Sequence, residues 1–372
     1  MSTVRANTYL DASGGSAAQL YGVASPPNSM GFRNRILNGD MRIDQRNAGA
    51  SLSYPASTYA NCLDRWQAQN ATDGAFTIQQ VAEAPAGFVN SLKFTTTTAD
   101  ASLAATQQAW IRQPIEGLNT ADLAWGSSSA QPVTLSFWVR SSLTGTFGGA
   151  LTNNAENRSY PFTYTINAAA TWEYKTVTIP GDTTGTWLTT NSRGIVLMLG
   201  LGVGSTYSGT AGAWAGSSFF TATGAVSVIG TLNATWQITG VQLEAGSVAS
   251  PFERRDYGRE LMMCQRYYQK SYNTDVAPGT NTTTGAKTSR VYNTDTFLPQ
   301  METRLLVSMR ASPTVTWYTT AGTSGSINVG GGTNTINTQY DTAMNSTGWF
   351  YVNGSVASGN QITGHFVASV EL

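Results

Sequence analysis

Apolar and polar residues alternate with period two along much of the stretch from residue 31 to residue 250. The clearest case is VTLSFWVR at 133–140, in which Thr134, Ser136, Trp138 and Arg140 share one face and the other face is apolar. This pattern predicts a β-strand with one buried face. AFTIQQV and EYKTVTIP follow it too, and turn-forming clusters such as PGDTTGT separate the segments. Many short strands with almost no helical periodicity favour a mostly β fold, an antiparallel β-sandwich of jelly-roll type.

The last strand predicted in this stretch changes face midway. In ATWQITGVQLEAG, Trp236 and Ile238 have one parity, whereas Val241 and Leu243 have the other. A β-bulge inserts one extra residue into a strand and would return all four side chains to the same buried face. We therefore expect a bulge at Gly240.

A helix is predicted where the sandwich ends. Ser250 is an N-cap candidate, Pro251 suits the first helical position, and Glu253 stands three residues after the cap, so together they predict a capping box. We place this short exit helix within residues 251–272. Its apolar positions form a narrow stripe made by Tyr257, Leu261, Cys264 and Tyr268.

The same segment concentrates charge in a chain that is only 11% charged. One interpretation is a connecting helix that packs on its own sandwich, with its charged face in solvent. The other places the helix near an axis where several copies meet and pair their charges across chains. The candidates for such an oligomer interface are Arg254, Arg255, Asp256, Arg259, Glu260 and Tyr267.

The two ends of the chain differ from the central stretch. Residues 1–30 are rich in small residues and have no useful periodicity, so we expect an extended arm that is disordered or ordered by a partner. Residues 273–372 contain further strand candidates, among them PTVTWYTTAG and GHFVASVEL. About 100 residues suffice for a second, smaller β domain, which would gain stability from oligomerisation.

Composition narrows the classes of function. The formal net charge is zero and lysines are few, which argues against a general phosphate-binding surface for nucleic acid. No segment approaches the roughly 18 uninterrupted apolar residues of a membrane-spanning helix, and the first residues lack the apolar core of a secretory signal, so no membrane insertion is expected. Cys62 and Cys264 are far apart in the sequence, and we expect them to be free, buried thiols.

Candidate catalytic groups are scarce, and no catalytic residue is assigned. His365 is the sole histidine, so a Ser-His-Asp or Cys-His mechanism would depend on it, but strand parity predicts a residue on a polar strand face. Metal-ligand spacings and cofactor motifs are missing, so neither a metal nor a cofactor is expected. Glycoside hydrolysis needs only two carboxylates, a requirement that the sequence leaves open. The acidic residues considered for it are Asp64, Asp73, Glu83, Asp100 and Glu116.

Aromatic residues offer another kind of chemistry, because their flat apolar faces stack on sugar rings while neighbouring polar groups bond the hydroxyls. Adjacent aromatic residues on a strand point to opposite faces, so each contiguous group should leave a ring on the outer surface. The glycan-binding candidates in the C-terminal domain are Trp317, Tyr318, Tyr340, Trp349, Phe350 and Tyr351. Further candidates, without positional support, are Trp110, Trp125, Trp138, Trp187 and Trp214.

Two motifs resemble those of a known class of proteins. NRILNGDMRIDQRNAGAS, followed by LDRW at 63–66, resembles the opening of carbohydrate-binding-module-like sandwiches in tail fibres and related adhesins of tailed bacteriophages. VQLEAGSVASPFERRDYGRELMMCQRYY is similar to the closing strand and exit helix of the same proteins. Together the motifs bracket residues 31–272. Within the first, Asn38-Gly39 is a turn former, and Trp66 is a large apolar anchor whose indole N–H needs a partner if it is buried.

The resemblance implies a homotrimeric virion protein that attaches to other virion proteins through residues 1–30 and presents residues 273–372 to the host. Such a fibre or adhesin would bind host surface polysaccharide without cleaving it. The arginines Arg33, Arg35, Arg42 and Arg46 could then pair with carboxylates of a neighbouring chain. Two alternatives stay open at this point, a polysaccharide depolymerase and a purely structural virion fibre or adaptor in the head or baseplate.

Overall fold

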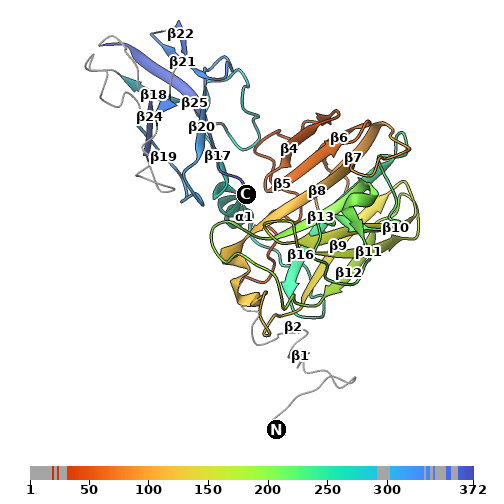
Figure 1. Ribbon diagram of the computed structural model, residues 1–372. Coiled ribbons are helices and arrows are strands. Elements are labelled where there is room, and N and C mark those ends of the chain that lie inside the picture. The colour runs from red at the N-terminus through yellow and green to blue at the C-terminus, as the bar shows by residue number, and fades with distance from the viewer. Residues whose placement is uncertain are drawn as a thin grey trace, which may run out of the picture.

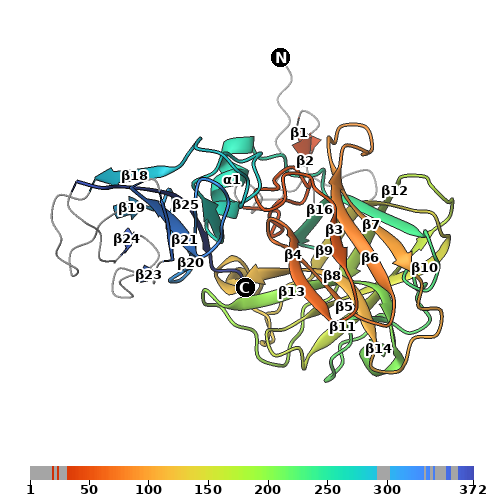
Figure 2. The same cartoon turned by 90° about the horizontal axis from the view of Figure 1, so that it is seen from above.

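The computed structural model describes residues 32–290, 302–330 and 359–372, together with strand segments at 19–20, 23–24, 332–335, 338–339 and 349–352. In these residues the chain forms a large β unit that ends at residue 245 and a smaller one that begins at residue 268 (Figure 1). The helix α1 (Tyr257–Gln265) lies between the two units in both views (Figures 1 and 2). Apart from β1 (Gln19–Leu20) and β2 (Val23–Ala24), the expected arm at 1–30 lies outside the described residues.

The large unit is a sandwich of two six-stranded antiparallel sheets, and the predicted mostly β fold is confirmed. Sheet I has the order β12 (Glu173–Ile179), β9 (Val133–Ser141), β16 (Thr235–Ala245), β7 (Ser91–Thr98), β6 (Ala75–Val81) and β3 (Leu52–Tyr54). Sheet II has the order β11 (Ser159–Ile166), β10 (Gly145–Thr152), β13 (Arg193–Val203), β8 (Gln108–Glu116), β5 (Trp66–Ala71) and β4 (Thr58–Leu63). Since β7, β8, β9 and β10 alternate between the sheets along the chain, the connectivity is jelly-roll-like.

Short elements complete the sandwich. The strands β14 (Ser208–Gly209) and β15 (Thr221–Ala222) pair in parallel. Three single-turn 3₁₀ helices lie in its loops, η1 (Gly117–Asn119), η2 (Ala121–Leu123) and η3 (Ser205–Tyr207).

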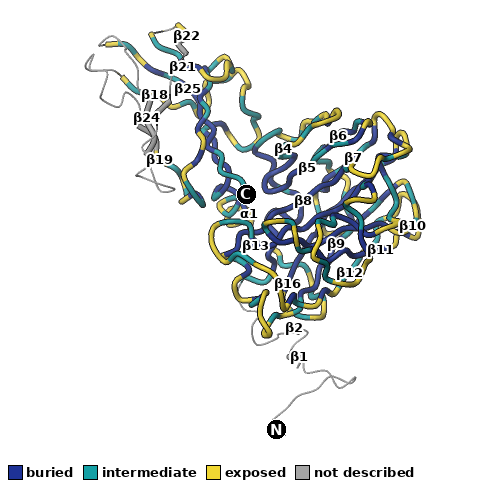
Figure 3. Tube along the Cα trace, in the orientation of Figure 1, coloured by how far each residue is buried: buried dark blue, intermediate teal, exposed yellow. Residues whose placement is uncertain are grey.

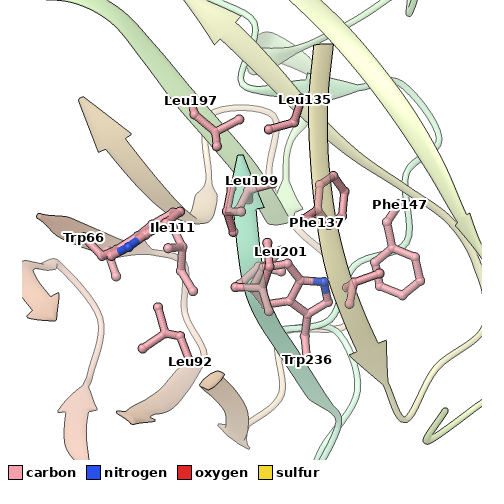
Figure 4. Packing of buried hydrophobic residues seen from close by; sticks show 14 of the residues in the cluster. Trp66, Leu92, Ile111, Leu135, Phe137, Phe147, Leu197, Leu199, Leu201 and Trp236 are labelled. Atoms are coloured by element: carbon pink, nitrogen blue, oxygen red, sulfur yellow. The ribbon is translucent and has the colours of Figure 1, made fainter. Parts of the chain in front are cut away.

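Apolar side chains from the inner faces of both sheets form the core (Figure 4). On β9 the apolar face predicted from the alternation, from Val133 to Val139, is fully buried. The buried backbone runs through the interior of the sandwich, and exposed loops surround it (Figure 3). Trp66 is fully buried, and its indole N–H finds its partner in the carbonyl of Asn38, 3.1 Å away, within the predicted turn.

The bulge predicted in the last strand of the sandwich is confirmed. The pairing of β16 with β9 shifts register between Thr239 and Gln242, and Gly240 has a φ of +62°. Trp236 and Ile238 before the shift are fully buried, as are Val241 and Leu243 after it. The extra residue therefore restores one buried face, as the parity change requires.

The exit helix is shorter than predicted and starts later. It begins at Tyr257, with Asp256 as N-cap, whose side chain accepts a hydrogen bond from the backbone N–H of Arg259 at 2.9 Å. The predicted cap, Ser250, instead donates its hydroxyl to Glu244 of the sandwich at 2.5 Å. The predicted apolar stripe is also wrong at its first position, because Tyr257 is 46% exposed. The buried face of α1 is formed by Glu260, Cys264 and Gln265.

The smaller unit is built around its last strand, which is β25 (Gln361–Ser369). Among the described residues, four strands pair with β25 directly, and three of them are β17 (Tyr268–Lys270), β18 (Lys287–Arg290) and β20 (Thr314–Tyr318). β21 (Ser326–Val329) also pairs with it and continues to β22 (Gly332–Thr335). A second sheet contains β19 (Glu302–Arg304), β24 (Trp349–Val352) and β23 (Thr338–Gln339).

The two units are joined by buried charges and tyrosine rings. Glu371 forms ion pairs with Arg46, at 2.5 Å, and with Arg65. The guanidinium group of Arg65 lies over the ring of Tyr267 at 3.6 Å, and that of Arg46 lies over the ring of Tyr268 at 3.9 Å. Burial alone would raise the pKa of Glu371, but the two arginines hold it below its ordinary value. The junction is therefore a specific, densely paired contact within one chain.

Three further findings concern the cysteines, the helices and the acidic and metal-binding side chains. Cys62 and Cys264 are free and buried, as predicted, and burial raises the pKa of both thiols. Within the described part of the chain, no helix is long and apolar enough to cross a membrane. Over the same residues, no group of three or more His, Cys, Asp or Glu side chains is placed to hold a metal ion.

Candidate functional site

A cleft of about 510 Å³ opens on the outer face of sheet I, the face turned away from the sandwich core. Strands β9, β12 and β16 form its floor, and the segment that leads from β16 to α1 forms a wall. This volume lies within the range of about 300–1,000 Å³ that is typical of small-ligand sites. The residues that line the cleft are Phe88, Trp138, Tyr174, Gly240, Ala249, Ser250, Pro251, Phe252 and Arg254.

Trp138 and Tyr174 form an aromatic pair on the floor. The two residues are direct partners across β9 and β12, and their ring centroids are 5.4 Å apart at an interplanar angle of 49°. Alternation along β9 buries Phe137 and Val139 in the core and leaves Trp138 half-buried on the outside. Tyr174 is 44% exposed. Two large rings therefore remain open to solvent on a rigid pair of strands.

Phe88, Phe252 and Arg254 form the wall that faces the Trp138–Tyr174 pair. The two phenylalanine rings meet edge to face, with centroids 5.3 Å apart. The guanidinium carbon of Arg254 lies 4.7 Å from the centroid of Phe88 and 5.9 Å from that of Phe252. Arginine stacks on aromatic faces in this way while its N–H groups remain directed outward in the plane of the guanidinium.

The glycine at the bulge, Gly240, lets the rings of Phe88 and Trp138 lie close to the backbone of β16. A β-carbon at this position would lie 2.7 Å from the ring tip of Phe88 and 3.2 Å from Cδ1 of Trp138. Its φ of +62° also lies in the left-handed region that favours glycine. The same residue that repairs the buried face of β16 therefore leaves room for two rings on the outer face.

Arg255, next to Arg254, points the other way and is buried. It pairs with Glu260 at 3.2 Å and Glu253 at 3.4 Å, and it also donates to the carbonyls of Asn34 and Ile36. Glu260 in turn accepts the backbone N–H of Asn38. This network joins the two sequence motifs within one chain.

The predicted oligomer interface is corrected by this network and by the junction. Arg255, Glu260 and Tyr267 are all buried by the chain's own residues, so they do not present a surface to a neighbour. Arg254, Asp256 and Arg259 are exposed.

The four arginines expected to reach a neighbouring chain also find carboxylates in their own chain. Arg35 pairs with Asp122 at 2.5 Å, and Arg33 lies 3.8 Å from Glu244. Arg42 pairs with Asp40, and Arg46 pairs with Glu371, as described above.

Polar groups flank the aromatic floor along the same strands. Arg140 and Gln237 both bind the carboxylate of Glu83, with the Gln237 contact at 2.9 Å. The hydrogen bonds from Gln237 and then from Arg140 hold the pKa of Glu83 below its ordinary value. At the other end, Ser250 and Gln242 engage Glu244. Both carboxylates are hydrogen-bonded, and neither lines the cleft.

The C-terminal glycan-binding candidates are not brought together as a site in the described residues. Trp317 is 1% exposed and belongs to the core of the smaller unit with Phe366, so its assignment as a surface contact is wrong. Tyr318 is half-buried and packs edge-on against Tyr272. Tyr340 and the side chains of Trp349, Phe350 and Tyr351 lie outside the described residues, so those predictions stay open.

Among the sandwich tryptophans, only Trp138 lines the cleft. Trp110 is buried under Phe220 and the half-buried Tyr207 on the outer face of sheet II. Trp125, Trp187 and Trp214 form a mutual edge-to-face cluster, with centroid distances of 4.7 to 5.4 Å. Their indole N–H groups donate to the carbonyls of Gln131, Thr184 and Pro180. This cluster ties loops together.

The candidate catalytic groups are engaged elsewhere. His365 is fully buried, which corrects its expected place on a polar face; its ring stacks on Tyr272 at 3.8 Å and contacts Ser271 and the carbonyl of Thr282. Burial lowers the pKa of His365.

None of the acidic candidates lines the cleft. Burial raises the pKa of Asp64 to about 6, and the carboxylate accepts two hydrogen bonds from Gln45. Glu116 is held by Arg266 and Tyr267, and Asp100 accepts the backbone N–H of Asp73. No acidic residue is among the described residues that line the cleft.

A second cleft, of about 580 Å³, lies at the junction of the two units. Lys270 lines it, but its ammonium group donates to three backbone carbonyls, those of Gln45, Thr274 and Val276. Burial lowers the pKa of Lys270 to about 8. Because all three protons are used, Lys270 holds the loop at 273–276 against the sandwich.

The aromatic cleft could be recognised only in part from the sequence. Period-two alternation places Trp138 and Tyr174 on outer faces, but pairing β9 with β12 requires knowledge of a contact between distant residues. The approach of Phe88 and residues 249–254 is equally non-local. The one part of the cleft that the sequence did predict was the bulge at Gly240.

Comparisons with known proteins yield structural similarities alone. No family model and no curated protein matches the sequence. A solved enzymatically active domain of tailspike protein 4 of bacteriophage CBA120 is 10% identical, with a TM-score of 0.29, and the match covers 57% of this chain and 21% of that one. A family 11 carbohydrate-binding module of Clostridium thermocellum, in complex with a β-1,3-1,4-mixed-linked tetrasaccharide, is 12% identical over 52% of this chain and 96% of its own, with a TM-score of 0.27.

A third similar structure, TmCBM61 in complex with β-1,4-galactotriose, is 8% identical over 49% of this chain and 88% of its own, with a TM-score of 0.26. At TM-scores this low, the function has to be inferred from the cleft itself.

Proposed function

We propose that this protein binds saccharides, without cleaving them, in the aromatic cleft of sheet I. The observation behind the proposal is the solvent-open pair of Trp138 and Tyr174, faced by Phe88, Phe252 and Arg254 across a glycine floor. Flat ring faces suit the C–H surfaces of a pyranose, and side chains at the edge supply hydrogen bonds to its hydroxyl groups.

Binding without hydrolysis agrees with the composition of the cleft. Glycoside hydrolysis uses two carboxyl groups that flank the scissile bond. Among its described lining residues there is no carboxyl group to act as acid, base or nucleophile. A saccharide held here would meet aromatic rings and one cation.

A saccharide also suits the cleft better than an extended peptide does. A peptide strand gains most when it pairs with the free edge of a sheet. The lining side chains project from the face of sheet I, and two of the three floor strands, β9 and β16, already have partners on both sides; the third, β12, is the edge strand. Binding of a peptide at the cleft would therefore contradict the proposal of a saccharide ligand.

The test is to apply the full chain to an array of bacterial surface glycans and to repeat the assay with two variants. Trp138→Ala removes a central ring and should lower the affinity for the retained glycan about 30-fold, the effect of truncating an aromatic anchor worth about 2 kcal/mol. Tyr257→Ala removes an aromatic ring that is 46% exposed but lies on α1, outside the cleft, and should leave binding unchanged. Retention of full affinity by Trp138→Ala, or binding of no glycan, would refute the proposal.

We further propose that the chain acts as an adhesin in a virion appendage, anchored through residues 1–30. The two sequence motifs and their spacing support this part, and residues 273–372 remain a candidate for an additional contact with the host. The homotrimer remains a prediction from the same resemblance, without Arg255, Glu260 or Tyr267 as its interface. Immunogold labelling of particles should place the protein on a tail or other appendage. Label that is absent from every appendage would contradict the assignment.

A further inference from the structure

We infer that the saccharide bound in the aromatic cleft is acidic, with its carboxylate, sulfate or phosphate group on Arg254. This inference rests on the proposed function and specifies its ligand class. The structural basis is the combination of exposed aromatic rings and one guanidinium group without an ion-pair partner among the described residues of the same cleft.

The charge balance of the cleft is the first step. Arg254 is the single charged residue among the described lining residues. Elsewhere on the outer face of sheet I, Arg140 is neutralised by Glu83. Arg254, in contrast, forms no ion pair within the described part of the chain, although Glu253 and Asp256 are close in sequence. Glu253 is turned toward the buried Arg255, and Asp256 caps α1.

The position of Arg254 is the second step. Its side chain is exposed at the cleft and is ordered by Phe88 and Phe252, over whose rings the guanidinium group lies. A guanidinium group stacked on rings keeps its in-plane N–H donors for a planar acceptor, and a carboxylate or a tetrahedral oxyanion can accept two of them at once. Holding the guanidinium group on the rings also reduces the entropy cost of that contact.

The floor and the facing wall of the cleft then bind different parts of the ligand. Trp138 and Tyr174 offer stacking surface to a sugar ring, whereas Arg254 on the facing wall recognises an anionic substituent of the same or the next sugar. A neutral saccharide would use only the rings and would leave the guanidinium group in water. The structure therefore favours acidic over neutral glycans.

The test uses the full chain and acidic bacterial polysaccharides printed in three forms: native, carboxyl-reduced and desulfated or dephosphorylated. Native acidic glycans should bind, and removal of the anionic group should weaken binding about tenfold or more, as for loss of a charge-assisted hydrogen bond. The modification that weakens binding identifies the anion as carboxylate or as sulfate or phosphate.

Matched variants assign the effect to Arg254. Arg254→Gln should lose about tenfold or more on the native glycan and almost nothing on its neutralised form, and Arg254→Lys should retain part of the affinity. Arg259→Gln changes the net charge equally, at an exposed arginine on α1 outside the cleft, and should leave both affinities unchanged. Melting temperatures of all variants verify that they fold.

The outcomes separate the inference from the function on which it rests. If neutral glycans bind best, or if neutralising the glycan weakens Arg254→Gln as much as the native protein, the acidic ligand is wrong. Glycan binding that is lost in Trp138→Ala but unchanged in Arg254→Gln would overturn this inference and leave the proposed function standing. Failure to bind any glycan would overturn both.

Discussion

Arg254 and Arg255 are adjacent in the sequence and have opposite surroundings. Arg254 lies on aromatic rings at the cleft, whereas Arg255 is 7% exposed and surrounded by Glu253, Glu260 and two backbone carbonyls. The extended backbone before α1 explains the difference, because successive side chains of an extended segment point to opposite sides. One arginine is therefore available to a ligand and the other stabilises the fold.

Replacement of Arg255 tests this division. Arg255→Gln should lower the free energy of unfolding by about 3–5 kcal/mol, since it leaves the buried carboxylate of Glu260 uncompensated. Arg259→Gln, at an exposed site, should change it by less than about 0.5 kcal/mol. Urea denaturation followed by circular dichroism measures both. Equal, small effects of the two substitutions would show that the Arg255 network does not stabilise the chain.

For single residues, the sequence predicted the need for a hydrogen-bond partner or for burial better than it predicted which other elements cover the residue. The need of Trp66 for a hydrogen-bond acceptor and the burial of both cysteines follow from side-chain chemistry alone. Parity also gives each strand two faces, but it does not say which face another element covers. Trp317, which packs in a core, and Trp138, which faces a cleft, therefore have indistinguishable local patterns.

At the scale of elements, the bulge in β16 shapes both surfaces of sheet I. It realigns Val241 and Leu243 with the core, and its glycine leaves space for Phe88 and Trp138 on the outer face. The parity change in the sequence was sufficient to predict the bulge. Its second role was not predictable, because Phe88 comes from a loop remote in the sequence.

Gly240→Ala should affect both properties. A left-handed φ costs an alanine roughly 1–2 kcal/mol of folding free energy, and the new methyl group would displace the ring of Phe88, so glycan affinity should fall as well. Gly224→Ala is the matched control, because Gly224 also has a positive φ, +80°, but no atom within 4 Å of an added β-carbon. It should lose similar stability and no affinity. Thermal melts and glycan titrations of the two variants give the comparison; unchanged affinity in Gly240→Ala would separate the bulge from the cleft.

The exit helix shows how tertiary contacts override a local signal. Ser250, Pro251 and Glu253 satisfy the sequence rules for a helix start, yet Glu244 and Gln242 of β16 engage Ser250 and Glu253. The segment stays extended for six more residues, and the helix begins at Tyr257. That extension is what places Phe252 and Arg254 on the cleft.

At the scale of the whole molecule, the two sequence motifs are neighbours in space. Asn34 accepts the backbone N–H of Leu243 and donates its own backbone N–H to Glu253 at 2.5 Å. Arg65 lies over the ring of Tyr267, and Arg46 lies over the ring of Tyr268. The concentration of charge around α1 thus serves contacts within the chain. The order of the β units followed from the sequence, but this contact between them did not.

The central claim is that the cleft of sheet I is where the molecule meets a saccharide. A crystal structure of the full chain with the glycan selected on the array tests it most directly. We expect a sugar ring against Trp138 and Tyr174, with an anionic group within hydrogen-bonding distance of Arg254. A glycan bound at the junction cleft, or on residues 273–372 with the sheet I cleft empty, would contradict the account.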